Sequence, residues 1–229
     1  MSNDVQKQPR RLPLRAVLFD LDGTLIDSAP DLGAAVNRMR ASRGLSLIDD
    51  ALLRPHASHG ARGLVGVGFG ITPDHVDYQA MRDEFLASYA AAICERTVIF
   101  PGVDELLDRL DASSLKWGIV TNKTTSLTLL LLEAMALKHR PSCIVCGDTT
   151  PRSKPHPEPL LAAAAMIDVP AGECLYVGDA ERDIEAGNAA GMATLVARYG
   201  YIREDEAPDK WPALGMLAAP LDLIEWLPL

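Results

Sequence analysis

The sequence predicts an α/β fold in which a mainly parallel sheet is covered by helices on both faces and interrupted by one helical insertion. Five short apolar runs are the first observation, and each of the first four ends in a polar turn. The runs span residues 16–19, 116–120, 143–146, 174–177 and 193–197. Helical patterns separate the later runs, and strands that alternate with helices form parallel sheets. We therefore expect a Rossmann-like core that carries a helical insertion.

The first predicted strand, 16–19, runs directly into Asp20 and the turn signal Asp22-Gly23-Thr24. Before it, residues 1–15 hold five charged residues and two prolines. They lack the apolar stretch and the small-residue cleavage site of a secretory signal. We expect this segment to be a solvated tail on a cytoplasmic protein.

Residues 29–100 are the second observation, because they predict helices and contain no strand of comparable quality. Turns are expected near Gly44, Pro55 and 70–73. The most periodic helical stretch spans 83–94, and Pro101-Gly102 is expected to close the insertion. The predicted organisation is a tail (1–15), an α/β core domain (16–28 and 101–229) and a helical domain (29–100).

Four glycines in the insertion invite comparison with a dinucleotide-binding loop. They stand at positions 63, 66, 68 and 70. Their spacing is not G-x-G-x-x-G and no predicted strand precedes them, so we do not expect nucleotide binding there.

Beyond the insertion, apolar spacing predicts helices over 103–110, 124–136 and 157–167. Cys143 and Cys146 form a C-x-x-C, which in other settings is a redox or zinc half-site. A second pair at zinc spacing is missing, and the intervening Ile-Val is typical of a buried strand. We interpret both thiols as small apolar side chains.

The overall charge and hydropathy exclude several classes of function. Lys and Arg number 22 against 31 Asp and Glu, a net charge of −9, which disfavours nucleic acid or an anionic membrane as the main partner. The most apolar run, 127–137, is interrupted by Thr128 and Glu133, so no membrane span is predicted. A small anionic substrate remains compatible, because local cations can offset a negative average.

Polar residues that could carry chemistry follow the predicted strands. They are Asp20, Asp22, Thr121, Asn122, Lys154, Asp179 and Asp183. Taken singly, each has an ordinary explanation as a turn, a helix cap, a solvated charge or a first-turn acid. A calcium loop starting at Asp20 is excluded, because its sixth and twelfth positions hold Leu25 and Asp31 instead of Gly and Glu. Gathered at one sheet edge, the set supplies a nucleophile, an acid, a hydroxyl, a cation and an acidic pair, which phosphoryl transfer needs.

In their order along the chain, these residues resemble the four signatures of the haloacid dehalogenase superfamily of aspartate-nucleophile phosphatases. The signatures are Asp20-Leu21-Asp22-Gly23-Thr24, Thr121 after an apolar strand, Lys154 before proline, and Gly178-Asp179 with Asp183. The helical insertion is similar to the family's cap domain. Segments 120–123, 154–155 and 199–201 are most similar to the bacterial phosphoglycolate phosphatase subgroup. Residues 60–62 with Trp211 are similar to a member of that subgroup that acts on N-acetylmuramic acid 6-phosphate.

The resemblance implies a chemical role for each residue of the core signatures. Asp20 is expected to attack phosphorus and form an aspartyl-phosphate, while Asp22 protonates the departing oxygen and later deprotonates water. Thr121 and the Asn122 amide are expected to hold phosphate oxygens. Lys154 is expected to offset the negative charge of phosphate and nucleophile.

The resemblance also implies a magnesium ion. Its expected ligands are the side chains of Asp20 and Asp179 and the backbone carbonyl of Asp22, together with the substrate phosphate. Asp183 is expected to orient Lys154 or a metal-bound water.

Substrate choice is expected to reside in the insertion. The candidates to meet the non-phosphate end of the substrate are His56, His59, Arg62 and His75. His59 and Arg62 are favoured by the resemblance, because the cap loop near them faces the core site in related enzymes. The expected function is magnesium-dependent hydrolysis of a small phosphorylated metabolite by a monomer or homodimer, with 2-phosphoglycolate as the first candidate substrate and a sugar phosphate as the second.

Other members of the family and other classes of protein stay open at this point. A sugar phosphomutase also keeps Asp22 and differs in that a sugar hydroxyl replaces water. A dehalogenase has no use for Asp22, and a phosphonatase needs a cap lysine, which residues 29–100 lack. A phosphoacceptor signalling domain is disfavoured by the length and the insertion, and a silent binding protein by the intact signatures.

Overall fold

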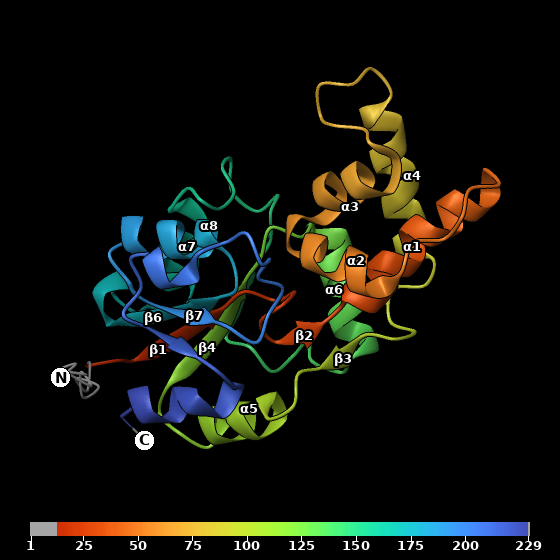
Figure 1. Cartoon of the computed structure of the whole chain (residues 1–229). Coiled ribbons are helices and arrows are strands. Elements are labelled where there is room, and N and C mark those ends of the chain that lie inside the picture. Colours follow the sequence, from red (N-terminus) through yellow and green to blue (C-terminus); the bar gives the residue numbers. More distant parts are fainter. Residues whose placement is uncertain (1–12, 229) are drawn as a thin grey trace, which may run out of the picture.

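The structure, a computed structural model, describes residues 13–228. At its centre is a six-stranded sheet in the order β5-β4-β1-β6-β7-β8, in which all neighbouring strands are parallel (Figure 1). The strands are β1 (Ala16–Phe19), β4 (Lys116–Val120), β5 (Cys143–Val145), β6 (Cys174–Gly178), β7 (Ala193–Ala197) and β8 (Gly215–Leu217). The predicted fold class is confirmed, and the short edge strand β8 was not predicted.

The predicted N-terminal tail ends earlier than expected, and its first twelve residues lie outside the described part of the chain. Leu14 is buried in the core. The Arg15 N–H donates to the Glu173 carbonyl at 2.9 Å, which continues the pairing of β1 with β6. Leu14 therefore packs in the core, because burial stabilises an apolar side chain next to a central strand, whereas Arg15 joins the sheet through its backbone and keeps its side chain exposed.

Helices cover both faces of the sheet. Helices α7 (Glu158–Met166) and α8 (Glu181–Ala189) lie above it in Figure 1, and α5 (Val103–Asp111) and the C-terminal 3₁₀ helix η4 (Pro220–Trp226) lie below it. Alternation along β1 sends side chains to both layers. Ala16 and Leu18 pack with residues of α7 and α8, whereas Val17 and Phe19 pack with residues of α5. This two-sided burial explains why β1 is an unbroken apolar run.

The register of the central strands determines where polar residues emerge. Phe19 at the end of β1 is level with Ile119 in β4 and Val177 in β6. The residues that follow these positions therefore leave the sheet at the same edge, as predicted for parallel strands.

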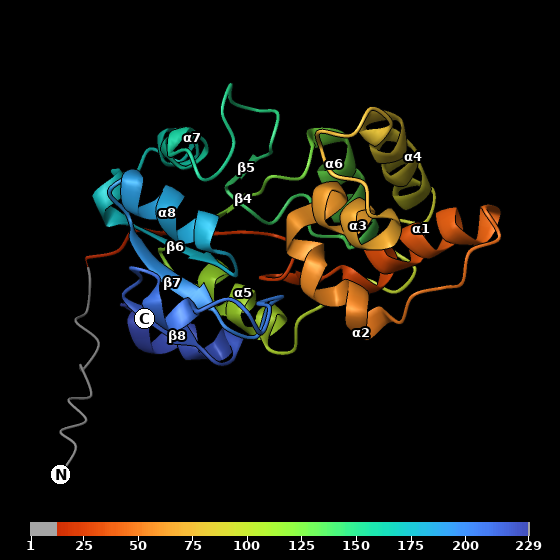
Figure 2. The ribbon, with the colours of Figure 1, turned by 45° about the horizontal axis from the view of Figure 1, so that its top comes forward.

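The insertion folds into helices grouped at one end of the core (Figure 2). They are α1 (Ala29–Ser42), α2 (Asp50–Leu53), the 3₁₀ helix η1 (Arg54–His59), α3 (Gly60–Phe69) and α4 (Tyr78–Ala90). Core helix α6 (Thr125–Ala134) lies beside them in both views. None of the helices described in residues 13–228 is long and apolar enough to cross a bilayer.

Three local predictions in the insertion were wrong. The helix predicted over 83–94 begins at Tyr78 and ends at Ala90, because the chain turns after that residue. The turn expected near Pro55 is the start of η1, since proline is tolerated in the first turn of a helix. The insertion is also joined to the core through two antiparallel strands, β2 (Ile26–Asp27) and β3 (Val98–Ile99), which are too short to show a periodic pattern.

The glycines of the insertion and the C-x-x-C pair have structural roles. Gly68 lies in α3, where a Cβ would come 2.6 Å from Val36 Cγ1, so the glycine permits close packing against α1. Cys143 begins β5 and Cys146 follows its end, and both thiols are buried and free. Burial raises the pKa of Cys143 to about 12, which keeps its thiol protonated and unreactive.

Candidate active site

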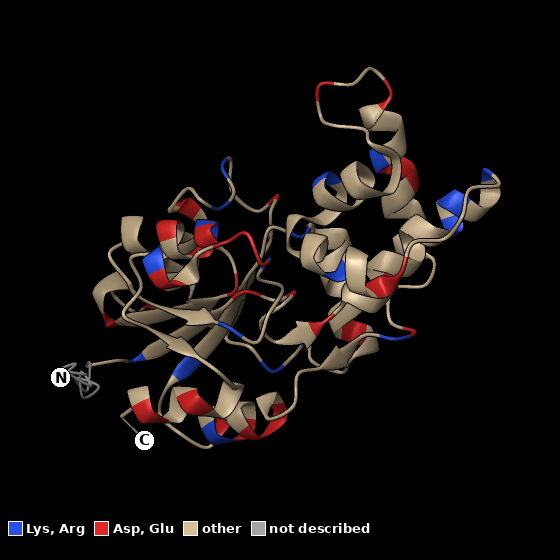
Figure 3. Cartoon of the chain, viewed as in Figure 1, with Lys and Arg blue, Asp and Glu red and all other residues tan. Residues whose placement is uncertain are grey.

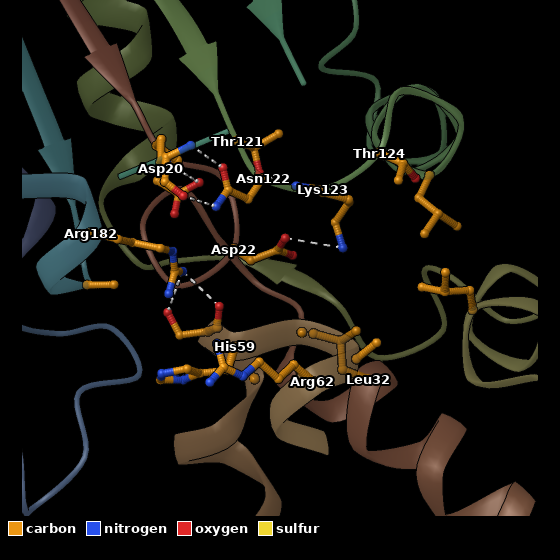
Figure 4. Close-up of a pocket in the computed structure, with 18 of the residues that line it drawn as sticks. Asp20, Asp22, Leu32, His59, Arg62, Thr121, Asn122, Lys123, Thr124 and Arg182 are labelled. Carbon is orange, nitrogen blue, oxygen red and sulfur yellow. Dashed lines mark hydrogen bonds and ion pairs between the residues drawn. The ribbon is translucent and has the colours of Figure 1, made fainter. Parts of the chain in front are cut away.

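The carboxyl ends of β1, β4 and β6 meet the insertion at a cavity of about 620 Å³ (Figure 4). The core contributes Asp20, Asp22, Thr121, Asn122, Lys123, Lys154 and Arg182 to its wall. The insertion contributes Ser58, His59, Arg62, Tyr78, Phe85 and Tyr89. Side chains that are far apart in sequence therefore line a single space between the two parts of the chain.

Asp20 is buried at the end of β1. Its Oδ1 accepts a hydrogen bond from the Leu21 N–H at 2.8 Å and lies 3.0 Å from Lys154 Nζ. Burial raises the pKa of this carboxyl and the nearby Asp183 adds to the rise, whereas the Lys154 ammonium opposes it. The arrangement holds one carboxylate next to one cation at the edge of the cavity.

Lys154 is fully buried and its ammonium is surrounded by oxygen atoms. Nζ lies 3.0 Å from Asp20 Oδ1 and 2.7 Å from Asp183 Oδ1. It also donates to the Val120 carbonyl at 2.9 Å and lies 2.7 Å from the Tyr176 hydroxyl. Because a buried cation requires such partners, this position is fixed and not a solvated surface charge.

Asn122 fixes the backbone of Lys154 and does not reach into the cavity with its amide group. Its Nδ2 donates to the Lys154 carbonyl at 2.9 Å, and its Oδ1 accepts from the Lys154 N–H at 3.0 Å. The backbone N–H of Asn122 has no hydrogen-bond partner among the described residues. A phosphate role for Asn122 therefore falls to this N–H, beside the Thr121 hydroxyl.

Three buried carboxylates gather next to Asp20. One oxygen each of Asp20, Asp179 and Asp183 lies within 4.8 Å of the others. The backbone makes room for them, since a Cβ at Gly23 would come 2.1 Å from Asp179 Oδ2 and one at Gly200 would come 2.4 Å from Asp179 Cβ. Burial, followed by repulsion from Asp20 and Asp183, raises the pKa of Asp179 to about 8.

This donor set fits a divalent cation. Carboxylate oxygens are the ligands that hard divalent ions prefer, and the two nearby cations, Lys154 and Arg182, do not neutralise three carboxylates. Both oxygens of Asp183 already have partners, since Oδ1 faces Lys154 and Oδ2 accepts from the Ala180 N–H at 3.0 Å. Asp20 Oδ2 has no hydrogen-bond partner among the described residues, and Asp179 Oδ1 has only a 3.5 Å contact with Ser58 Oγ, whereas Asp179 Oδ2 accepts from the Tyr201 N–H at 2.9 Å. Asp20 and Asp179 thus each keep one oxygen open to a cation, and Asp183 orients Lys154.

Asp22 points away from Asp20, towards Lys123 (Figure 4). Its Oδ1 accepts from the Ser28 hydroxyl, and its Oδ2 lies 3.2 Å from Lys123 Nζ. The two carboxylates of the first signature both line the cavity but have different partners, since Asp20 faces Lys154 and the acidic cluster, and Asp22 faces Lys123 and Ser28. The sequence analysis included Lys123 in the segment 120–123 that resembles the phosphoglycolate phosphatase subgroup, but it gave this lysine no role of its own.

On the insertion side, two of the four candidates line the cavity. His59 and Arg62 face it, whereas His56 and His75 do not. Of the four candidates, the lining therefore includes only His59 and Arg62. Burial, with the nearby Arg182 guanidinium, lowers the pKa of His59, so its imidazole is neutral at pH 7.

Arg182 is a cavity residue that the sequence analysis did not identify. It stands at the start of α8, one position before Asp183, and its Nη2 donates to the Ser58 carbonyl at 2.7 Å and lies 3.1 Å from the Ser58 hydroxyl. Ser58 Oγ lies 3.5 Å from both carboxylate oxygens of Asp179. Core and insertion are thus in polar contact directly above the acidic cluster.

Comparison with known proteins agrees with this geometry. The family model of haloacid dehalogenase-like hydrolases matches residues 17–197. A phosphoglycolate phosphatase of Xanthomonas campestris pv. campestris is 45% identical over 92% of this chain and 95% of its own length. An N-acetylmuramic acid 6-phosphate phosphatase of Pseudomonas putida is 40% identical over 92% of this chain and 94% of its own length.

A solved structure is similar to this chain over most of its length. The crystal structure of a predicted phosphoglycolate phosphatase from Haemophilus somnus superposes with a TM-score of 0.80 at 25% identity, covering 94% of this chain and 99% of its own. Similarity in sequence and in fold thus extends over both the core and the insertion. The chain therefore belongs to the haloacid dehalogenase-like hydrolase family, and it is a phosphatase.

Proposed function

We propose that the chain is a magnesium-dependent phosphatase that hydrolyses 2-phosphoglycolate, or a chemically similar small phosphomonoester, through an aspartyl-phosphate. The observation that carries the proposal is that the two carboxylates after β1, Asp20 and Asp22, have different partners. Both line the cavity, but Asp20 lies 3.0 Å from Lys154 inside the acidic cluster, whereas Asp22 lies 3.2 Å from Lys123 outside it. One carboxyl is placed for attack on phosphorus and the other for proton transfer.

The bond changes follow from these positions. An oxygen of Asp20 attacks phosphorus, the ester P–O bond breaks, and Asp22 gives a proton to the departing oxygen. Asp22 then takes a proton from a water molecule that attacks the same phosphorus, which releases inorganic phosphate and restores Asp20. The Thr121 hydroxyl and the Asn122 N–H hold the phosphoryl oxygens during both steps, and the buried Lys154 ammonium offsets the negative charge from behind Asp20.

We propose that Mg²⁺ is held by the carboxylates of Asp20 and Asp179 and by the backbone carbonyl of Asp22, and that Asp183 acts through Lys154. When bound, the ion supplies positive charge that reduces repulsion between the Asp20 carboxylate and the phosphate dianion. The fit rests on the cluster of buried oxygen donors and on its excess of negative charge.

We propose that residues 29–100 act as a cap over a core made of residues 16–28 and 101–229. The antiparallel pair β2–β3 lies where the chain enters and leaves the insertion, which makes it the expected hinge. His59 and Arg62 line the cavity from the cap side, so they are placed to contact the non-phosphate end of the substrate. Arginine binds a carboxylate through two parallel hydrogen bonds, which suits a phosphorylated hydroxy acid.

A sugar phosphate such as N-acetylmuramic acid 6-phosphate is the second candidate substrate. The cavity of about 620 Å³ lies in the range of pockets that enclose drug-sized ligands, and its cap side includes the half-buried side chains of Tyr78 and Leu86. Such a wall suits the apolar face of a sugar ring. The Pseudomonas putida relative carries that substrate in its name.

The proposed reaction is tested with the variant Asp20→Asn and a panel of phosphomonoesters that includes both candidate substrates. Asp20→Asn keeps the shape of the side chain and removes the nucleophile, so phosphate release is expected to fall by at least about 10³-fold. The matched control is Asp104→Asn, an exposed carboxylate of α5, which is expected to retain full activity.

Mass spectrometry of rapidly quenched wild-type enzyme is expected to find a phosphoryl group on the peptide that contains Asp20. Near-normal activity in Asp20→Asn would show that the mechanism is wrong. Transfer of phosphate to a second sugar hydroxyl in place of water would make the protein a phosphomutase.

We further propose that the protein works in the cytoplasm, as a monomer or homodimer. Its four cysteines, Cys94, Cys143, Cys146 and Cys174, are all free, which is typical of proteins from reducing compartments.

A further inference from the structure

Lys123 is anchored in the core and extends its side chain into the cavity (Figure 4). Its backbone N–H donates to Thr121 Oγ1 at 3.2 Å, and its carbonyl accepts from the Gly147 N–H at 2.9 Å. The side chain is only 7% exposed. Its ammonium therefore occupies a defined position and is not a mobile surface charge.

The ammonium of Lys123 connects the core to the insertion. Nζ lies 3.2 Å from Asp22 Oδ2 and 3.3 Å from the hydroxyl of Tyr89, and it stands 4.5 Å from the centroid of the Tyr89 ring. Tyr89 belongs to α4 and is fully buried. Asp22 and Lys123 come from the core, so this contact exists only while α4 rests on the core.

Asp22 is supported at both of its oxygens. Oδ1 accepts from the Ser28 hydroxyl and Oδ2 faces the Lys123 ammonium. A carboxyl that has a single partner can rotate about its side-chain bonds, whereas two partners on different segments fix its orientation. The support at Oδ2 depends on Lys123, which in turn depends on Tyr89.

The charge states agree with this network. Burial disfavours the charge on Lys123, but the Asp22 carboxylate and the Tyr89 hydroxyl more than offset it, so the pKa of Lys123 is raised. Burial raises the pKa of Tyr89 to about 12, which keeps its hydroxyl neutral. A neutral hydroxyl and an aromatic face are both favourable partners for an ammonium ion.

We propose that Lys123 is a positioning residue that, together with Tyr89 of the insertion, holds the Asp22 carboxyl in the orientation needed to protonate the leaving oxygen. The inference rests on the proposed role of Asp22 as the general acid. Its consequence is that the acid is fully oriented only when the insertion is closed, because withdrawal of α4 removes Tyr89 from Lys123.

The test is a series of aryl phosphates of similar shape whose leaving groups become steadily more acidic: phenyl, 4-nitrophenyl and 2,4-dinitrophenyl phosphate. A good leaving group departs without a proton, so its hydrolysis does not need an oriented acid. The measured quantity is kcat/KM, which covers the steps up to the departure of the leaving group and excludes hydrolysis of the aspartyl-phosphate.

Lys123→Met is expected to lower kcat/KM for phenyl phosphate by at least about tenfold more than for 2,4-dinitrophenyl phosphate, as part of the 10²- to 10⁴-fold that a general acid typically contributes. Tyr89→Phe keeps the ring and removes one oxygen, so it is expected to show the same trend with a smaller amplitude. If Lys123→Met folds poorly, Tyr89→Phe still tests the proposal through the other partner of the contact.

Two control variants isolate the effect. Lys138→Met removes an exposed lysine that pairs with Glu133 at 2.7 Å, and it is expected to leave all rates unchanged. Tyr78→Phe removes a hydroxyl from the same helix and the same cavity wall, and it is expected to leave the ratio between substrates unchanged.

The outcomes separate this inference from the proposed function on which it rests. An equal loss for all three substrates in Lys123→Met and Tyr89→Phe, beside a selective loss for phenyl phosphate in Asp22→Asn, would overturn only the positioning role. If Asp22→Asn shows no selective loss, Asp22 is not the acid, and both assignments are wrong.

Discussion

Asp183 shows how one side chain can serve a helix and a reactive site together. Its Oδ2 accepts the Ala180 N–H at the start of α8, in the manner of a capping side chain, while its Oδ1 lies 2.7 Å from Lys154 Nζ. A cap places the carboxylate in the first turn of the helix, where the helix dipole favours negative charge. Lys154 is thereby held beside Asp20 by a group whose own position is set by secondary structure.

At the same scale, we predict that Arg62 discriminates between substrates. Arg62 lines the cavity but is exposed, so its removal should leave the fold intact. A charge-assisted hydrogen bond contributes roughly 1.5 to 3 kcal/mol, so Arg62→Ala is expected to lower kcat/KM for 2-phosphoglycolate by roughly 10- to 150-fold. Hydrolysis of 4-nitrophenyl phosphate, which lacks the carboxylate, is expected to change little.

Arg109→Ala is the matched control for this prediction, because Arg109 lies on α5 and pairs with Glu105 at 2.6 Å, outside the residues that line the cavity. Equal losses on both substrates in Arg62→Ala would indicate impaired closure of the insertion. An unchanged kcat/KM on both substrates would remove Arg62 from the site.

At the scale of elements, α5 supports the sheet although none of its residues lines the cavity. Four apolar side chains of this helix are buried, and their spacing of three, one and three residues places them on one face. They are Val103, Leu106, Leu107 and Leu110. They pack in the cluster that also holds Val17 and Phe19 of β1, so the helix supports the strand that presents Asp20.

We therefore predict that Leu107→Ala destabilises the fold and spares the reaction. Removing a fully buried leucine side chain leaves a cavity and typically costs about 2 to 5 kcal/mol of unfolding free energy. Urea denaturation is expected to show this loss, while kcat at 25 °C stays near the wild-type value. Leu130→Ala on α6, where the side chain is 47% exposed, serves as the control with little change in stability. A lower kcat in correctly folded Leu107→Ala would contradict the separation of scaffold and site.

At the scale of the whole molecule, the surface and the interior differ in their balance of positive and negative charge. Lys and Arg are interspersed with Asp and Glu over the core helices and the insertion (Figure 3), and surface ion pairs of this kind contribute little to stability. The interior differs, because the three carboxylates of the acidic cluster, Asp20, Asp179 and Asp183, face two cations, Lys154 and Arg182. Without a metal ion, the folded state carries unfavourable buried negative charge.

We predict that this charge makes the metal-free protein sensitive to pH. The pKa of Asp179 rises from its ordinary value of 3.8 to about 8 on folding, so the folded state binds a proton that the unfolded state has lost. The resulting stabilisation is complete below pH 3.8 and is lost as the pH rises through 8. The Tm of EDTA-treated protein, measured by calorimetry, is therefore expected to fall between about pH 5 and pH 8.

Magnesium at 100 times its Kd is expected to raise the unfolding free energy at pH 8 by about 2.7 kcal/mol, which restores the Tm. Asp179→Asn removes the titrating group, so the Tm of this variant should depend less on pH and should not rise when magnesium is added. The variant is also expected to lose activity, as the wild-type enzyme does on chelation. A metal-free wild-type Tm that is flat over this pH range, or full activity after exhaustive EDTA treatment, would contradict the metal assignment.

The sequence by itself determined the fold class and the common edge at which the signature residues meet. Apolar runs such as 16–19 and 174–177, each ending in a polar turn, indicated buried strands, since strands covered on both faces are apolar at nearly every position. Parallel strands end at one edge, so Asp20, Thr121 and Asp179 could be placed together before any coordinates were known. Short or irregular elements such as β2 and β3 left no such pattern.

Only the tertiary structure decided how the insertion meets the core. No periodic or spacing signal in the sequence links the residues that join core and insertion, which are Lys123, Tyr89, Arg182 and Ser58. Their contacts depend on the direction of the side chains across the cavity. The same holds for Asn122, whose side chain bonds the Lys154 backbone, and for the two histidines that do not line the cavity. Contacts between segments distant in the chain arise from the packing of whole elements, which local sequence patterns do not encode.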